Sequence, residues 1–415
     1  MSHVRRSGTS VGFAAVLHLR EFRLLWLADV QSLLGDQLAR VALSVLVYDR
    51  TGSGLATASV YALSFIPALL GSFLLGPLAD RLPRRALLVG GDLARAVLLA
   101  VMAVPHMPVA VLAALLAVAV LVGTPWKAAE SALVVDILAA EDYVMGAGLR
   151  TATVQAAQLA GFALGGLAVA AVGTRAALAI DAATFFASAI VIRIGVRARP
   201  AAHVRSQSDN SQPSWFNGAA EVFRDHRLRQ LVGLAWLLGI LVVPEGLGVP
   251  YAHLLGGGAR TVGVLLAALP AGVLVGSVIY ARCLSPATRA TLVGPLAVGA
   301  GIPLIVCATT PALPLTMILW AVSGLCTAYQ IQVVAEFVQT ISPSIRGQGI
   351  SLASGGLLAA QGIGLVAGGA VAQLTSPGTA IAAAGGLATI LAAGLAAARR
   401  RGETRSGEQA AGAPT

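Results

Sequence analysis

Long, nearly uncharged apolar segments are the feature that most constrains how this chain folds. Of its 415 residues, 57% are apolar and only 11% are charged, and the mean hydropathy is +0.82. Soluble domains carry roughly 25% charged residues, so the composition indicates an integral membrane protein. A span needs about 20 apolar residues to cross a hydrocarbon core of about 30 Å, and its backbone must be helical or part of a closed barrel. The sequence lacks the alternating ten-residue strands of a barrel, so we predict an all-α membrane protein.

The apolar segments divide into twelve predicted transmembrane helices. They lie near 24–48, 55–79, 85–104, 108–130, 146–172, 176–195, 229–254, 261–281, 290–309, 314–338, 350–374 and 378–398. We therefore expect a first six-helix bundle over 24–195 and a second over 229–398, joined by a cytoplasmic linker over 196–228. Residues 1–23 form the N-terminal segment, and residues 399–415 form a tail that we expect to be disordered.

The net charge of +10 is explained by topology rather than by nucleic-acid binding. With twelve spans and both termini on one side, most of the 28 Lys and Arg residues fall on that side, and only Arg50, Arg175 and Arg260 fall opposite. The positive-inside rule then predicts cytoplasmic termini and some contact with anionic lipid. The N-terminus has no signal-peptide pattern, and the three cysteines show no metal or disulfide spacing.

An internal repeat relates the two predicted bundles. The order Gln, Gly, Gly-Gly recurs at identical spacing near the end of each set of six spans, which predicts parallel repeats related by an axis along the membrane normal. Small residues four apart also let helices pack closely, and we expect them to form a smooth seam between the bundles. The matched residues are Gln158, Gly161, Gly165 and Gly166 in the first copy and Gln361, Gly364, Gly368 and Gly369 in the second.

A short charged loop separates the second and third spans. It resembles the signature loop of the major facilitator superfamily, with Pro83 where that family usually has Gly, and the resemblance extends over about residues 20–395. It implies two six-helix bundles related by a pseudo-two-fold axis, and a loop that holds the outward-facing state through its acidic residue and basic partners. The matching residues are Gly76, Asp80, Arg81, Arg84 and Arg85.

Other segments resemble the drug-exporting branch that contains macrolide efflux and enterobactin exporter-like proteins. They include Asp36-Gln37, Tyr48 to Ser53, Asp92 to Ala96, Asp181 to Phe185 and Pro343 to Gly347. Gly161-Phe162 stands where antiporters of the superfamily have Gly-Pro. The resemblance implies a monomeric multi-pass protein of a bacterial-type cytoplasmic membrane that transports amphipathic molecules.

No cofactor or nucleotide site is predicted. The single lysine, Lys127, follows Pro125-Trp126, so the chain has no phosphate-binding Gly-x-x-x-x-Gly-Lys loop. Energy would then come from an ion gradient, of protons or alternatively of sodium. A carboxylate in a low-dielectric span can bind and release a proton as access alternates.

The first span carries the clearest set of ionisable candidates. Asp29, Asp36 and Arg40 share one helix face, which must point to the bundle interior. Asp36 and Arg40 lie one turn apart and are expected to form an ion pair that a proton or substrate disrupts, or alternatively a permanent structural pair. Glu245 in the seventh span lies between Pro244 and Gly246 with no basic residue in helical reach. We expect it to meet a proton or a cationic substrate, or alternatively to have a partner from another helix or to be exposed at the outer mouth.

The remaining candidates are given structural or cavity roles. Asp92 with Arg95, and Asp181 with Arg175, are predicted charge pairs, and Glu336 near the cytoplasmic end of the tenth span is expected to form a salt bridge between helices. Aromatic and amide side chains on helices that line the central cavity in the resembled fold are candidates for substrate contact or for packing. These are Trp236, Trp320, Tyr329 and Gln332.

The sequence thus predicts a non-enzymatic exporter of a small amphipathic molecule, coupled to protons and working by alternating access. An importer or facilitator of the same fold is the first alternative. A non-transporting receptor or assembly factor and a partner-dependent, ATP-driven permease are the others, and the latter class lacks both the loop and the repeat.

Overall fold

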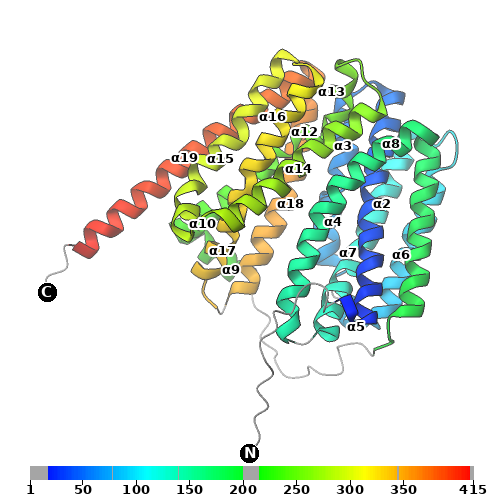
Figure 1. Cartoon of the computed structure of the whole chain (residues 1–415), viewed down its shortest axis with the longest axis horizontal. Coiled ribbons are helices and arrows are strands. Elements are labelled where there is room, and N and C mark those ends of the chain that lie inside the picture. Colours follow the sequence, from blue (N-terminus) through cyan, green and yellow to red (C-terminus); the bar gives the residue numbers. More distant parts are fainter. Residues whose placement is uncertain (1–16, 77, 139, 200–214, 344, 412–415) are drawn as a thin grey trace, which may run out of the picture.

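The computed structural model describes residues 17–76, 78–138, 140–199, 215–343 and 345–411, and over these residues it is built of helices without strands (Figure 1). The helices form two halves that lie side by side. The N-terminal half contains α2 to α8 and the C-terminal half contains α9 to α19. Predictions for residues 1–16, 200–214 and 412–415 lie outside the described residues.

The N-terminal half holds six spans. Its second span is interrupted at 63–65, just before Pro67, and its fifth and sixth spans form one continuous helix that turns at Gly173 (φ 81°, ψ 167°). The positive φ at that position suits a residue without a Cβ. The elements are α2 (Arg20–Thr51), α3 (Gly54–Ala62), α4 (Ile66–Leu74), α5 (Leu78–Arg81), α6 (Arg84–Met102), α7 (Val109–Ile137) and α8 (Ala140–Gly195).

The C-terminal half holds the other six spans. Its first span is broken into four short helices because Pro244, Pro250 and several glycines interrupt the backbone hydrogen bonds. The elements are α9 (Trp215–Arg224), α10 (His226–Trp236), α11 (Leu238–Leu241), α12 (Val243–Gly246), α13 (Gly248–Leu254), α14 (Ala259–Cys283), α15 (Pro286–Ile305), η2 (Val306–Thr309), α16 (Leu313–Cys326), η3 (Thr327–Tyr329), α17 (Gln330–Thr340), α18 (Arg346–Leu374) and α19 (Pro377–Ala411).

The predicted all-helical fold with two six-helix bundles is confirmed. Ten helical stretches within the described residues are long and apolar enough to cross a membrane. Helix α6 is not among them because it carries Arg84, Arg85, Asp92 and Arg95, and α8 supplies two spans on either side of its turn, which gives twelve. The tail differs from the sequence prediction, since α19 continues as a helix to Ala411.

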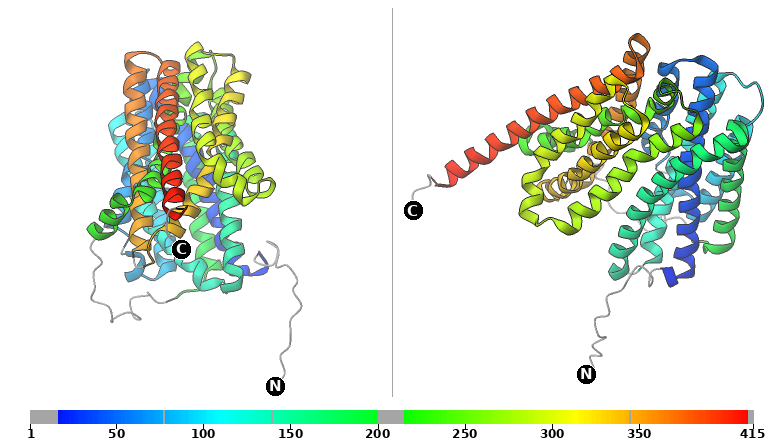
Figure 2. Two further views of the ribbon diagram at one scale, coloured as in Figure 1. Left: turned by 90° about the vertical axis from the view of Figure 1, so that its left-hand side faces the viewer. Right: turned by 45° about the horizontal axis from the view of Figure 1, so that its top comes forward.

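The two halves meet at the end of the molecule that lies away from both termini (Figures 1 and 2). The opposite end, toward the termini, is the wide end. At the closed end Gly166 of α8 and Gly263 of α14 pack backbone against backbone, so that a Cβ on Gly166 would lie 2.4 Å from the Gly263 Cα atom. Polar contacts join the halves at the same end. Ser53 Oγ lies 2.9 Å from Gln373 Oε1, and His253 Nε2 lies 3.8 Å from the Asp49 carboxylate.

The glycines of the internal repeat divide between two tasks. Gly161 and Gly364 pack against the first span of their own halves, where added Cβ atoms would meet Gln37 and Gly239. The matched Gly166 and Gly369 instead face the opposite half. A Cβ on Gly369 would lie 2.8 Å from the Ala58 Cβ. The predicted seam between bundles is therefore formed by part of the repeat and not by all of it.

Candidate functional site

A cavity of about 680 Å³ lies between the two halves. Its walls come from α8 of the N-terminal half and from the seventh, eighth, tenth and eleventh spans of the C-terminal half. Most of the lining is aliphatic, with amide and hydroxyl groups distributed over it, which is the surface expected for an amphipathic ligand. The polar lining residues are Gln155, Gln158, Glu245, Ser277, Arg282, Ser323, Thr327, Gln330 and Gln361.

The repeat places equivalent amides on both sides of this cavity. Gln158 on α8 and Gln361 on α18 occupy matched positions in the two copies, and both line the wall. Gln155, one turn before Gln158, lines it too. A side-chain amide offers two donors and one acceptor oxygen, so the pair can bond polar groups on either side of a ligand.

Glu245 lies where the cavity meets the junction between the halves. It belongs to the four-residue helix α12, and only 8% of its surface is exposed. The hydroxyl of Tyr61 on α3 donates a 2.7 Å hydrogen bond to Glu245 Oε2. A partner from another helix is one of the alternatives that the sequence leaves open, and the structure supplies it from the opposite half. Glu245 thus links the two halves while it faces the cavity.

The four cavity candidates of the C-terminal half are not among the residues that line this cavity, and their contacts are those of the packing alternative. Trp236 donates through Nε1 to the Ala353 carbonyl at 3.0 Å, and Trp320 is fully buried against Tyr251. Tyr329 donates to the Leu234 carbonyl at 3.0 Å, and Gln332 donates to Glu336. These side chains hold helices together, while Gln330 and Ile331 beside them face the cavity.

A second, smaller cavity of about 90 Å³ lies inside the N-terminal half. It is lined from five spans by charged and small residues. Asp36 forms an ion pair with Arg95 of α6, not with Arg40 as the helical spacing suggests. Arg40 donates to Gln37 Oε1 at 3.4 Å and its guanidinium lies 5.8 Å from the ring centres of Tyr61 and Phe65. The lining residues with charge are Asp36, Arg40, Arg95, Lys127 and Asp181.

Two further charge pairs expected from sequence differ in the structure. Asp92 accepts a 2.6 Å hydrogen bond from Ser188 Oγ, because Arg95 turns toward Asp36 and stacks its guanidinium over Phe185 at 3.9 Å. Asp181 is fully buried and accepts from the Thr184 hydroxyl at 3.2 Å. Its predicted partner Arg175 is exposed instead, near the turn of α8.

Acidic residues near the wide end are paired within their own half. Arg150 of α8 forms an ion pair with the buried Glu130 of α7 and lies 3.8 Å from Asp29 of α2, so Asp29 is part of a three-residue charge cluster. In the C-terminal half, Arg399 Nη2 lies 2.9 Å from Glu336 Oε1. The structure therefore contains the salt bridge predicted for Glu336.

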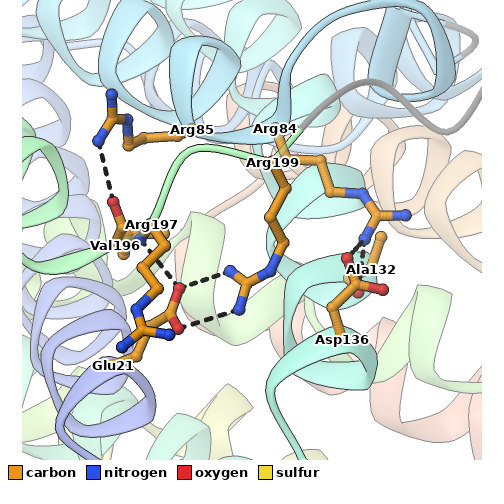
Figure 3. A network of polar contacts seen from close by, with 8 residues as sticks. All are labelled: Glu21, Arg84, Arg85, Ala132, Asp136, Val196, Arg197 and Arg199. Carbon is orange, nitrogen blue, oxygen red and sulfur yellow. Dashed lines mark hydrogen bonds and ion pairs between the residues drawn. The ribbon is translucent and has the colours of Figure 1, made fainter.

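The signature loop is anchored to the N-terminal half by its basic residues (Figure 3). Arg84 forms an ion pair with Asp136 and donates to the Ala132 carbonyl at 3.1 Å, both near the end of α7. Arg85 donates to the Val196 carbonyl at 3.2 Å, just past the end of α8. Cations at helix C-termini satisfy free carbonyls and the helix dipole. The Asp80 side chain, to which the switch role was assigned with Gly76 and Arg81, lies outside the described residues.

The same surface ties the first span to the start of the linker. Glu21 accepts from the Arg197 backbone N–H at 2.9 Å and from the Arg199 guanidinium at 2.5 and 2.9 Å (Figure 3). The hydrogen bond to Glu21 raises the pKa of Arg199 above its ordinary value. This bidentate ion pair therefore holds the segment after α8 against α2.

Sequence reasoning missed Tyr61, Lys127 and the cavity role of Gln158 and Gln361. For the glutamines the signal was present, since they are the polar members of the repeat. For Tyr61 the sequence held no indication, because its contact with Glu245 depends on how the halves pack.

Two packed bundles of six spans around a shared cavity define a membrane transporter, not an enzyme. The sequence matches the Major Facilitator Superfamily over residues 25–310, and the chain belongs to that family. A sequence comparison with curated proteins finds no match.

Solved structures share the fold at low sequence identity. The nucleoside transporter NupG aligns with a TM-score of 0.70 at 15% identity, covering 91% of this chain and 98% of that one. A bacterial homologue of the iron transporter ferroportin in an inward-facing state aligns with a TM-score of 0.65 at 16% identity over 91% and 99%. A bacterial homologue of the human lysosomal transporter Spinster, inward-facing and occupied, aligns with a TM-score of 0.69 at 13% identity over 95% and 98%.

Proposed function

We propose that this protein exports a small amphipathic molecule across a bacterial-type cytoplasmic membrane in exchange for protons. The observation that carries the proposal is the 680 Å³ cavity, which both halves line and which contains a buried carboxylate at their junction. Its size suits a drug, an antibiotic or a siderophore-like natural product, and its mainly aliphatic wall suits the apolar part of such a molecule.

Alternating access follows from how the halves contact each other. Close backbone packing of Gly166 with Gly263 lies at the end away from the termini, so this conformation is open on the side of the termini. With cytoplasmic termini, as the positive-inside rule predicts, the conformation is inward-facing. Two of the solved structures of the same fold are likewise described as inward-facing.

Glu245 is the proposed proton site. Its carboxylate is buried, lines the cavity and receives one hydrogen bond from Tyr61 across the junction. Protonation removes the charge that strengthens this bond, so the two halves part more easily. Return of the proton to the cytoplasm restores the bond. Asp36 and Arg40 in the smaller cavity, and Asp29 beside Arg150, are the further coupling candidates.

The test uses a bacterium that lacks its own drug exporters. Expression of the chain is expected to lower sensitivity to some members of a panel of amphipathic antibiotics, and everted vesicles should take up the same compounds when acidified inside. Glu245→Gln, matched for expression, should abolish both effects. Uptake by the acidified vesicles that Glu245→Gln leaves unchanged would remove Glu245 from the coupling mechanism.

An importer or facilitator of the same fold is the second candidate, because the similar structures include a nucleoside transporter and proteins described as POT family and peptide transporters. It predicts that the chain raises intracellular levels of the transported compound and increases sensitivity to toxic analogues.

A further inference from the structure

The charges around the smaller cavity do not balance. Three cations and two carboxylates line it, and one of each is consumed in the pair between Arg95 and Asp36. The second carboxylate, Asp181, is not within ion-pair distance of Arg40 or Lys127 among the described residues. Within the described residues, Arg40 and Lys127 on this wall therefore have no carboxylate within ion-pair distance, and the cations that line the cavity outnumber the carboxylates by one.

Among the described residues, the direct contacts of the Arg40 guanidinium are with neutral groups. Its guanidinium donates a long hydrogen bond to the Gln37 amide oxygen and lies beside the rings of Tyr61 and Phe65. A guanidinium has five N–H donors, so most of them remain available for an oxyanion. Ring faces next to the cation also suit the apolar body of an aromatic or aliphatic molecule.

Lys127 is the single lysine of the chain, and its side chain is exposed in the described structure. It lies in the part of α7 nearer the wide end, and it shares the cavity wall with Arg40 and Thr124. The ammonium group has neither an ion pair nor a hydrogen bond within the described part of the chain. An ionised residue within a span faces the bundle interior or water rather than lipid, and such residues mark ligand or ion paths.

We propose that Arg40 and Lys127 form a binding site for the anionic group of a small organic molecule, such as a carboxylate, sulfonate or phosphate. A volume of about 90 Å³ accommodates such a group but not a whole drug-sized molecule. The inference rests on the proposed function, because it states that the transported molecule carries a negative charge. Binding is measured without an ion gradient, so the site can be tested whether or not transport is observed.

The single lysine makes the test specific. The full chain, purified in detergent, is acetylated with an amine-reactive ester, and mass spectrometry follows labelling of the peptide that contains Lys127. The probes share one ring system and differ in charge: naphthalene-1-acetate, its neutral amide, and the quaternary trimethyl(1-naphthylmethyl)ammonium ion, which cannot react with the ester. At ten times its Kd, naphthalene-1-acetate is expected to slow labelling of Lys127 about tenfold by mass action. The amide and the ammonium ion should leave the rate unchanged.

Equal slowing by the neutral amide would show that only apolar contact protects the lysine, and the proposal would fail. Equal slowing by inorganic phosphate would assign the site to free inorganic anions and would also overturn it. Labelling that no probe slows, up to millimolar concentrations, has the same consequence.

Variants of Arg40 test the second cation. Arg40→Gln is expected to weaken protection of Lys127 by naphthalene-1-acetate about tenfold or more, because a charge-assisted hydrogen bond is lost. Arg40→Lys keeps the charge as long as its new lysine is not acetylated, so it is labelled to a low extent and followed at the Lys127 peptide. It should then retain most of the protection, which separates binding from folding. Arg175→Gln makes the same charge change at an exposed position near the turn of α8, and it should behave like the unmodified chain. Wild-type protection in Arg40→Gln would exclude Arg40 from the site.

Discussion

Replacing Gly166 with alanine is expected to shift the protein out of the conformation described here. The added Cβ would lie 2.4 Å from the Gly263 Cα atom, whereas Cβ contacts below 3.0 Å essentially never occur. The two helices would therefore have to separate by at least 3.0 − 2.4 = 0.6 Å, and because the obstacle is backbone, no side chain can turn away. Overpacking of this kind costs about 1–3 kcal/mol.

The contact exists only while the halves meet at the end away from the termini, so this cost falls on one conformation. The ratio of this conformation to the alternative should therefore fall about 5- to 150-fold, at 1.4 kcal/mol for each tenfold change. Gly263→Ala should act in the same direction, since its Cβ would lie 2.7 Å from the Gly166 Cα atom.

Spin labels at the wide end can measure the shift. Cys283 is an exposed natural cysteine at the end of α14, and Leu82→Cys provides an exposed partner on the N-terminal half once Cys307 and Cys326 are replaced. Electron–electron distance measurements should show a new, shorter population in Gly166→Ala. Gly386→Ala is the control, because a Cβ there meets nothing within 4 Å. A distance distribution identical in the unmodified chain, the control and Gly166→Ala would refute the reasoning.

Three further predictions concern the charged and polar contacts. Tyr61→Phe removes the hydroxyl that donates a hydrogen bond to the Glu245 carboxylate, and the loss of such a bond costs about 1–3 kcal/mol. The same distance measurement should therefore show a smaller population with the long distance between the two spin labels. Tyr48→Phe, which keeps the ring beside His253, should not change it. Arg95→Met leaves the Asp36 carboxylate without its partner, and breaking such a pair costs about 3 kcal/mol, so the thermal unfolding midpoint in detergent should fall strongly. The control Arg175→Gln should leave the midpoint unchanged. An unchanged midpoint in Arg95→Met would mean that Asp36 finds another partner. Glu21→Gln weakens the bidentate bond to Arg199 and should increase the rate of proteolysis after Arg197 in detergent. High salt should reduce the difference in rate between the variant and the unmodified chain. Equal cleavage rates would show that this ion pair does not hold the segment.

The fold could be predicted from the sequence because each span is a long apolar run and because the repeat fixed the relation between the bundles. Boundaries shifted mainly where a proline or glycine interrupts a helix, as in the seventh span around Pro244 and Pro250. The continuous helix α8 was not expected, since a single glycine at 173 takes the place of a loop.

Partners of buried charges were harder to predict. Spacing along one helix suggested that Asp36 binds Arg40. In the structure Arg95 from α6 forms the ion pair with Asp36, and Arg40 contacts Gln37 and two aromatic rings. Helical spacing describes neighbours on one helix and carries no information on which side chain a packed neighbour supplies. The same limit hid the contact between Tyr61 and Glu245, which joins residues from different halves.

The single-residue turn at Gly173 has a mechanical consequence. Two spans that are joined by one residue cannot slide along each other or tilt apart at that end. They therefore move as a rigid pair whose outer ends stay together at this tip. Gly166 lies two turns from this tip and touches the other half there. When the outer side opens, the two spans therefore leave the other half together as one unit, and the Gly166 contact breaks in the same step.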